Sequence, residues 1–142
     1  MIVRSMVLLW VLSTFSLGAA GQSDPVLVSA NIPMYPAIAC TARVEGEVKV
    51  TFTLGASSNE PTQVEVLSGH PLLKPAALEN VKTWRFINPY AVDRKYETTF
   101  TFRLSGRELP STATKRLTVS LESFRTVEIM TDAYQATMNY AQ

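Results

Sequence analysis

The sequence predicts an α+β fold, a two-layer sandwich in which an antiparallel three-stranded sheet carries helix on one face. Gly46–Leu54 and Tyr96–Leu104 alternate apolar and polar residues, as strands do when one face of a sheet is buried. Between them, apolar residues recur at helical spacing around Pro75. The predicted order is strand, strand, helix, strand, with a short helix before it and an extra strand or hairpin after it.

The first residues have the three parts of a secretory signal peptide. Arg4 precedes an uncharged, mostly apolar run, Met6–Leu17, and the small residues 18–21 follow. The run is shorter than the roughly 20 residues that span a bilayer. We therefore expect residues 1–21 to be a cleaved leader, with an uncleaved membrane anchor as the alternative. Gln22 stands where a lipoprotein would need a cysteine.

Loss of the leader leaves a formally neutral chain of single-domain size. Removal of Arg4 lowers the basic residues from 13 to 12, which equals the 12 acidic residues. This balance argues against the polybasic surface that binds nucleic acids or anionic lipids. About 120 residues remain, enough for one domain with a modest core. The lone Cys40 has apolar neighbours, which indicates a packed side chain.

The chain divides into segments by composition. Residues 1–21 are the leader, 22–31 a lead-in, 32–106 the main domain, 107–134 a C-terminal strand extension and 135–142 a frayed tail.

The main domain opens with two prolines and a short helix. Pro33 and Pro36 bias the residues before them toward extended conformations. Ala37–Arg43 then has a helix-forming composition, and Pro36 suits the start of a helix.

A hairpin follows this helix. The apolar residues of the first strand share one face: Val48, Val50, Phe52 and Leu54. Residues 55–62 are rich in turn formers, and Val64–Val66 make a shorter second strand. The two strands therefore form an antiparallel hairpin with a long loop.

The main helix begins near Pro75, because proline is tolerated in the first turn of a helix but not in its interior. Its sheet-facing residues are Leu73, Ala77, Val81 and Trp84. Asn88–Pro89 ends this element.

The third strand, Tyr96–Leu104, presents an aromatic face that should pack on the helix. After a break at 105–110, Leu117, Val119 and Leu121 alternate with polar residues, and the pattern resumes at Val127 and Ile129.

No group of residues indicates an enzyme. His70 is the sole histidine and has no companion ligands for zinc, so we expect it to mark the helix start. The serines Ser57, Ser58 and Ser68 lack a neighbouring base and carboxylate. We therefore expect no catalysis, no metal and no cofactor.

Several motifs in combination resemble the C-terminal domain of TonB, the energy transducer of the Gram-negative outer membrane. The resemblance covers about Asn31 to Leu104. The matching stretches are the P-x-Y-P of Pro33–Pro36, R-V-E-G-E-V-K-V-T-F at Arg43–Phe52, S-G-H-P-L-L at Ser68–Leu73, and V-K-T-W-R-F at Val81–Phe86 followed by Pro89.

The resemblance implies a periplasmic binding function. TonB domains grip a short extended segment of outer-membrane transporters, the TonB box, which adds as a strand to the edge of the sheet. Carried over to this chain, Tyr96–Leu104 would supply the docking edge and Arg43 would reach the transporter plug. The remaining predicted contacts are Pro33, Tyr35, Pro36, Arg85, Tyr96, Thr98, Phe100 and Phe102. Tyr35 has packing in the core as its alternative role, and Arg85 has a surface ion pair.

Departures from a complete TonB leave two other functions open. An extended chain spans at most about 3.3–3.6 Å per residue, so residues 22–31 are too short to cross a periplasm. If the leader is cleaved, we expect no motor partner. The alternatives are a short membrane-anchored transducer and an envelope structural protein that dimerises through exposed strand edges. The stretch 117–129 would cover the docking edge or lie in the dimer interface.

Overall fold

The computed structural model describes residues 23–110 and 112–135. The predicted leader, residues 1–21, and residues 136–142 of the predicted tail lie outside this range. The elements are β1 (Val26–Ser29), α1 (Ala37–Thr41), β2 (Gly46–Leu54), β3 (Pro61–Ser68), α2 (Lys74–Lys82), β4 (Arg85–Ile87), β5 (Arg94–Leu109), β6 (Leu117–Ser123) and β7 (Thr126–Tyr134). Neither of these helices is long and apolar enough to span a membrane.

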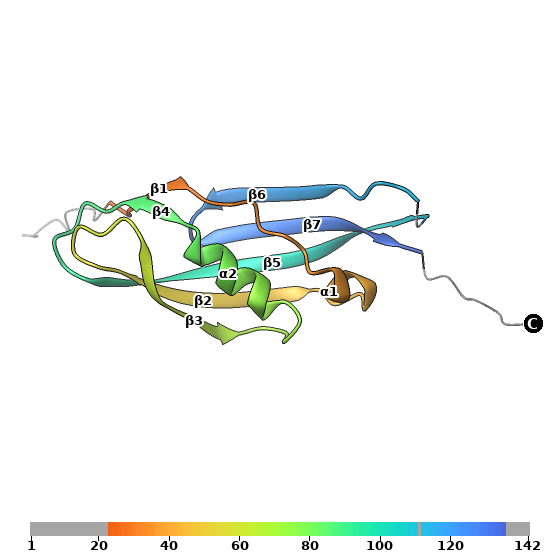
Figure 1. The fold of residues 1–142 in the computed structure, drawn as a ribbon, viewed down its shortest axis with the longest axis horizontal. Helices are drawn as coiled ribbons and strands as arrows, with labels where there is room; N and C mark the ends of the chain where they lie inside the picture. The colour runs from red at the N-terminus through yellow and green to blue at the C-terminus, as the bar shows by residue number, and fades with distance from the viewer. Residues whose placement is uncertain (1–22, 111, 136–142) are drawn as a thin grey trace, which may run out of the picture.

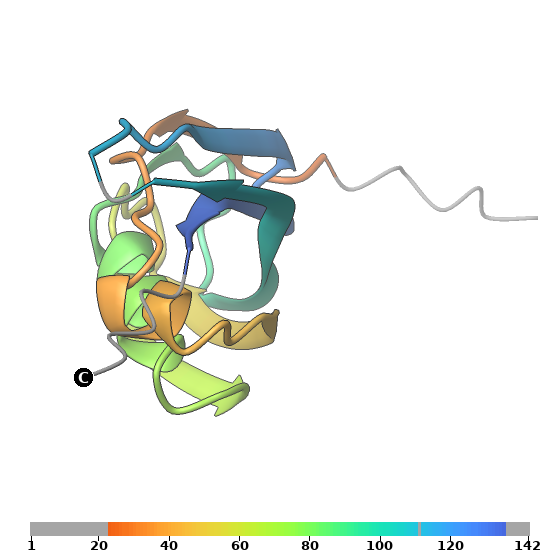
Figure 2. The ribbon, with the colours of Figure 1, turned by 90° about the vertical axis from the view of Figure 1, so that its right-hand side faces the viewer.

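Five strands form one large sheet in the order β3, β2, β5, β7 and β6, while β1 pairs with β4 in a small separate sheet. The large sheet is curved, and both helices lie on its concave side (Figure 2). This arrangement confirms the predicted α+β class with helix on one face of the sheet.

The predicted hairpin and third strand make up the antiparallel part of the sheet. β2 pairs with β5 along its whole length, from Gly46 opposite Phe102 to Leu54 opposite Arg94. β3 pairs with the other side of β2 through two register shifts. Both β3 and β5 are longer than predicted. Their pairing with neighbouring strands includes residues outside the alternation of apolar and polar side chains.

The C-terminal stretch forms a hairpin that joins the same sheet. β6 runs antiparallel to β7, and β7 runs parallel to β5, with Thr99 opposite Thr126 and Leu104 opposite Thr131. The predicted three-stranded antiparallel sheet is therefore one part of a mixed five-stranded sheet. β5 continues through residue 106, where the main domain was expected to end.

α2 forms where Pro75 predicts it and buries the predicted face. Leu73, Ala77 and Val81 have no exposed surface. His70 shapes the turn before the helix, because its Nδ1 accepts a hydrogen bond from the Leu72 N–H at 3.2 Å. The helix then ends at Lys82, two residues before Trp84.

Aromatic side chains fill the space between α2 and the sheet. Trp84 is only 1 % exposed, and its ring centroid lies 5.9 Å from those of both Phe52 and Phe100. Phe124, from the β6–β7 turn, packs edge-on against Phe86 at 5.5 Å. Such contacts add about 0.5–1.5 kcal/mol per ring pair beyond burial itself. The hairpin and the main domain thus share one core.

The sequence pattern does not predict β1 and β4. Both strands are short, and most of their side chains are exposed. Neither strand therefore shows an alternation long enough to predict it from the sequence. β4 follows α2 directly, and Leu27 of β1 lies opposite Phe86. Asn80 Nδ2 also donates to the Asn31 carbonyl at 2.9 Å. These contacts hold the lead-in against the end of α2.

Candidate functional site

The candidate site is the edge of β5 that faces away from β2. The side chains predicted as contacts on this strand are buried in the core, with exposed fractions of 8 % or less: Tyr96, Thr98, Phe100 and Phe102. A partner at this edge would therefore meet the backbone of β5 rather than these side chains.

β7 covers only the later part of this edge. Its pairing with β5 begins at Thr99, whereas among the described strands Lys95–Thr98 pair only with β2. Figure 1 shows β5 extending beyond the start of β7. The expectation that Tyr96–Leu104 offers a free edge is thus corrected, because β7 already occupies the edge from Thr99 to Leu104. The stretch that no other described strand covers is Lys95–Thr98, called the free stretch below.

Two residues of the free stretch turn their peptide groups outward. The Thr99 N–H donates to the Arg125 carbonyl at 2.9 Å, on the side away from β2. Peptide groups alternate in direction along a strand, so those of Lys95 and Glu97 face the same side. Sequence reasoning missed these two residues, because alternation shows which side chains are buried but not which neighbour each peptide group faces.

A groove of about 840 Å³ runs beside the free stretch. It is lined by Asp24, Thr51, Leu67, Tyr90, Arg94, Lys95, Tyr96, Glu97 and Arg125. These residues come from the lead-in, three strands, the β4–β5 connection and the β6–β7 turn, so only the folded chain assembles the groove.

Charge pairs shape the walls of the groove. Arg125 donates two hydrogen bonds to Asp24, from Nε at 3.0 Å and from Nη2 at 2.7 Å. These bonds lower the pKa of the Asp24 carboxyl. The Arg94 guanidinium lies 3.6 Å from the centre of the Tyr90 ring, a cation–π arrangement. Arg125 and Arg94 are thereby held in defined positions on the groove.

Two buried hydroxyl groups at the groove have no partner among the described residues. They belong to Thr51 and Tyr96, which are 5 % and 8 % exposed. Burial also raises the pKa of Tyr96, which keeps its hydroxyl protonated and able to donate. A buried hydroxyl without a partner costs about 1–3 kcal/mol, so these two groups lower the stability of this part of the sheet.

The proline-framed tyrosine lies in the core, away from this groove. Tyr35 is 9 % exposed, its hydroxyl donates to the Val44 carbonyl, and its ring meets that of Phe102 edge-on at 5.4 Å. Pro33 is buried, and the Pro36 carbonyl accepts a hydrogen bond from the first helix, α1. Tyr35 therefore packs in the core, which is the alternative role given for it in the sequence analysis.

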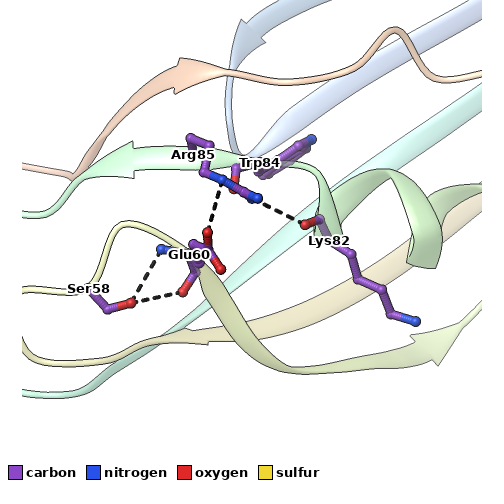
Figure 3. Close-up of polar contacts among 5 residues, drawn as sticks. All are labelled: Ser58, Glu60, Lys82, Trp84 and Arg85. Carbon is purple, nitrogen blue, oxygen red and sulfur yellow. Dashed lines mark hydrogen bonds and ion pairs between the residues drawn. The ribbon is translucent and has the colours of Figure 1, made fainter.

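The two predicted arginine contacts are held by ion pairs. Figure 3 shows Arg85 between β4 and the start of β3, with Nε 3.2 Å from Glu60 Oε1 and Nη1 donating to the Trp84 carbonyl at 2.8 Å. Arg43 pairs with Glu108 near the C-terminal end of β5. Both side chains are 45 % exposed. They lie apart from the groove, and Arg85 has the ion pair that was its alternative role.

The remaining potential metal ligands and the lone cysteine lie apart from one another. In the part of the chain that the structure describes, no three His, Cys, Asp or Glu residues lie close enough to hold a metal ion. Cys40 is buried, and Lys115 Nζ lies 3.1 Å from its sulfur. The geometry of the free edge and its groove suits the binding of an extended chain.

Comparisons with known proteins match the greater part of the described chain. A family model described as Gram-negative bacterial TonB protein C-terminal matches residues 31–104. Among solved structures, the chain is similar to the solution NMR structure of the Pseudomonas aeruginosa TonB CTD. The identity is 29 % and the TM-score 0.50, over 63 % of this chain and 96 % of that chain. No curated protein matches.

Proposed function

Since this chain belongs to the TonB C-terminal family, a transport-associated and non-enzymatic family of the Gram-negative envelope, we propose that it is a periplasmic binding module. Its ligand is an extended segment of an outer-membrane transporter or of another envelope protein. The segment adds as a strand to the free stretch of β5, Lys95–Thr98.

The observation that carries this proposal is the unpaired edge of β5 beside the groove. Lys95 and Glu97 each offer an outward N–H and C=O there, and β7 leaves this position vacant before Thr99. An incoming strand would lie end to end with β7 in the same sheet. Main-chain hydrogen bonds hold such a segment largely independently of its sequence.

The groove gives the bound segment its side-chain contacts. Segment residues that alternate toward the groove would meet side chains that line it, among them the Tyr90 ring and the Arg125 guanidinium. The free stretch offers few backbone groups, so these contacts have to supply much of the affinity. Strands that add to short edges need such pockets for specificity.

Amide hydrogen exchange tests the position of the added strand. The outward N–H groups of Lys95 and Glu97 should exchange rapidly in the free protein, and a bound strand should protect them. A peptide copied from the N-terminal segment of an outer-membrane transporter is the probe. The matched control is Thr99, whose N–H is already bonded to Arg125 and should change little. Protection elsewhere without protection of Lys95 and Glu97 would place the binding site on another edge.

A proline substitution tests the hydrogen bond from the Lys95 N–H through its effect on the affinity for the peptide. Lys95→Pro removes the outward N–H but no hydrogen bond of the folded sheet, since proline is tolerated at a free edge. We expect at least about tenfold weaker peptide binding, a loss of about 1.4 kcal/mol, measured by isothermal titration calorimetry. Lys95→Ala removes the same side-chain contacts but keeps the N–H, so it should bind the peptide more tightly than Lys95→Pro. Equal affinity of Lys95→Pro and the unchanged protein would refute strand addition at this position.

We also propose that residues 1–21 are removed on export, so that the module does not itself transmit force from an inner-membrane motor. The measurement is the intact mass of protein from fractionated Gram-negative cells. A soluble periplasmic species that begins near Gly21 or Gln22 supports the proposal. A membrane-bound species that retains Met1 would favour the short anchored transducer.

A further inference from the structure

The two outer edges of the large sheet differ in their protection against pairing. β3 has a proline at its start, two register shifts, and a left-handed residue, Gln63, with φ of 48°. Such irregularities keep other strands from adding to an edge. β6 pairs with β7 without a shift from Leu117 to Leu121, and this stretch carries no charged residue. β6 is therefore the unprotected edge.

The outer side of β6 presents an ordered row of peptide groups. The Arg116 carbonyl accepts a hydrogen bond from the Asp132 N–H, on the β7 side. Alternation along the strand then turns the peptide groups of Leu117, Val119 and Leu121 away from β7. Among the described strands, none pairs with this side of β6.

Apolar side chains accompany these outward peptide groups. Leu117 and Leu121 are 43 % and 47 % exposed, large values for leucines in a strand. Val119 and Leu121 also line a cleft of about 160 Å³ whose far wall includes Ile32 and Trp84. The edge thus combines unpaired backbone with apolar surface that the monomer leaves open to water.

The sequence of this edge is complementary to itself in the antiparallel direction. It reads R-L-T-V-S-L-E from Arg116 to Glu122, with Val119 at its centre. Reversal about Val119 sets Arg116 against Glu122, Leu117 against Leu121, and Thr118 against Ser120. Opposite charges, paired hydroxyls and paired aliphatic groups are the cross-strand pairs that stabilise antiparallel sheets.

We propose that β6 is a homodimer interface, in which two copies pair antiparallel about a two-fold axis at Val119. The two five-stranded sheets then become one continuous sheet. The partner's Leu117 lies opposite Leu121, at the mouth of the apolar cleft. Each dimer contains the Arg116–Glu122 pair twice, as two-fold symmetry requires.

The register is specific. Moving the axis to Thr118 would set Leu121 against Lys115 and Glu122 against Thr114. Moving it to Ser120 would set Leu117 against Ser123 and Arg116 against Phe124. Either shift loses both the charge pair and the Leu–Leu pair, so only the axis at Val119 satisfies every position.

Charge exchange tests this register directly. Arg116→Glu alone and Glu122→Arg alone each place like charges opposite one another twice per dimer. The double variant, Arg116→Glu with Glu122→Arg, restores opposite charges. We expect each single variant to raise the dimer dissociation constant at least about tenfold, and the double variant to return it to within about threefold of the original. The measurement is sedimentation equilibrium of protein expressed from all 142 residues, with reductant so that Cys40 cannot cross-link.

The control is a charge reversal on the other outer edge of the sheet. Glu65→Arg reverses a charge on β3, the other outer edge, and should leave the dissociation constant unchanged. A protein that remains monomeric at about 1 mM would overturn the proposal. A double variant as weak as the single variants would also overturn it. No peptide is present, so the result is independent of strand addition at β5.

Discussion

Tyr35 illustrates how a side chain framed by prolines becomes part of the core. Pro33 and Pro36 hold the chain extended, which directs the Tyr35 ring onto Phe102. Burial is the main cause that raises its pKa to about 12, and the negative charge of Glu45 adds to the effect. The hydroxyl therefore stays protonated and bonded to the Val44 carbonyl over the physiological range.

The raised pKa predicts a loss of stability at high pH. The unfolded chain ionises Tyr35 near pH 10, while the folded chain keeps the proton to about pH 12. The free energy of unfolding should therefore be unaffected by this group below pH 10 and fall between these values. Tyr35→Phe should reduce the fall, leaving the part due to Tyr96, and cost about 1 kcal/mol at pH 7 for the lost hydrogen bond. Urea unfolding at several pH values measures this, and identical slopes for both proteins would contradict it.

Alanine substitutions at Gly69 and Gly46 compare the effect of side-chain crowding with that of backbone conformation. Their φ angles are similar, +136° and +142°, both unfavourable for other residues. A Cβ at Gly69 would lie 2.8 Å from Val48 Cγ2 and 3.0 Å from Val48 Cα, whereas one at Gly46 meets nothing within 4 Å. Gly69→Ala should therefore destabilise the protein by about 1–3 kcal/mol more than Gly46→Ala. Equal losses in denaturant unfolding would show that backbone conformation alone matters.

At the scale of elements, the edge of β5 that faces away from β2 has two parts. From Thr99 onward it holds β7, and before Thr99 it is open to the groove. The Asp24–Arg125 pair sits at this junction, because Arg125 lies in the turn that leads into β7 and its carbonyl accepts from Thr99. The turn between β6 and β7 thus fixes where the covered edge ends.

The hairpin also changes which edges the whole sheet presents. Without it, β5 would be an outer strand along its full length. With it, the outer strand on that side is β6, whose apolar edge differs in character from the irregular β3 edge. The open part of β5 and the outer side of β6 are therefore different edges of the same sheet.

At the scale of the molecule, the hairpin and the TonB-like region have one core. Ile129 is fully buried with Phe100 and Phe102 of β5, and Val127 lies opposite Phe100. The family match ends at Leu104, yet the core does not. The described chain should therefore unfold as one unit rather than as a domain with a detachable extension.

Substitution at Ile129 tests this unity. Ile129→Ala should lower the free energy of unfolding by about 2–5 kcal/mol, as buried aliphatic truncations do. Met130→Ala, the neighbour on the opposite face of the sheet, should cost less than about 1 kcal/mol. Trp84 fluorescence and far-ultraviolet circular dichroism should report the same midpoint in each variant. A hairpin transition that leaves Trp84 fluorescence unchanged would disprove the single unit.

The sequence by itself determined the class of fold, the main strands and helix, and which side chains are buried. These follow from local periods: Val48 to Leu54 alternate with period two, and Leu73, Ala77 and Val81 follow the helical period. Tertiary structure alone decided that β7 lies parallel to β5, that β1 and β4 pair, and that β7 leaves Lys95–Thr98 uncovered. The physical reason is that strand neighbours and the direction of peptide groups depend on contacts between residues far apart in the chain, such as Thr99 with Arg125, which no local pattern records.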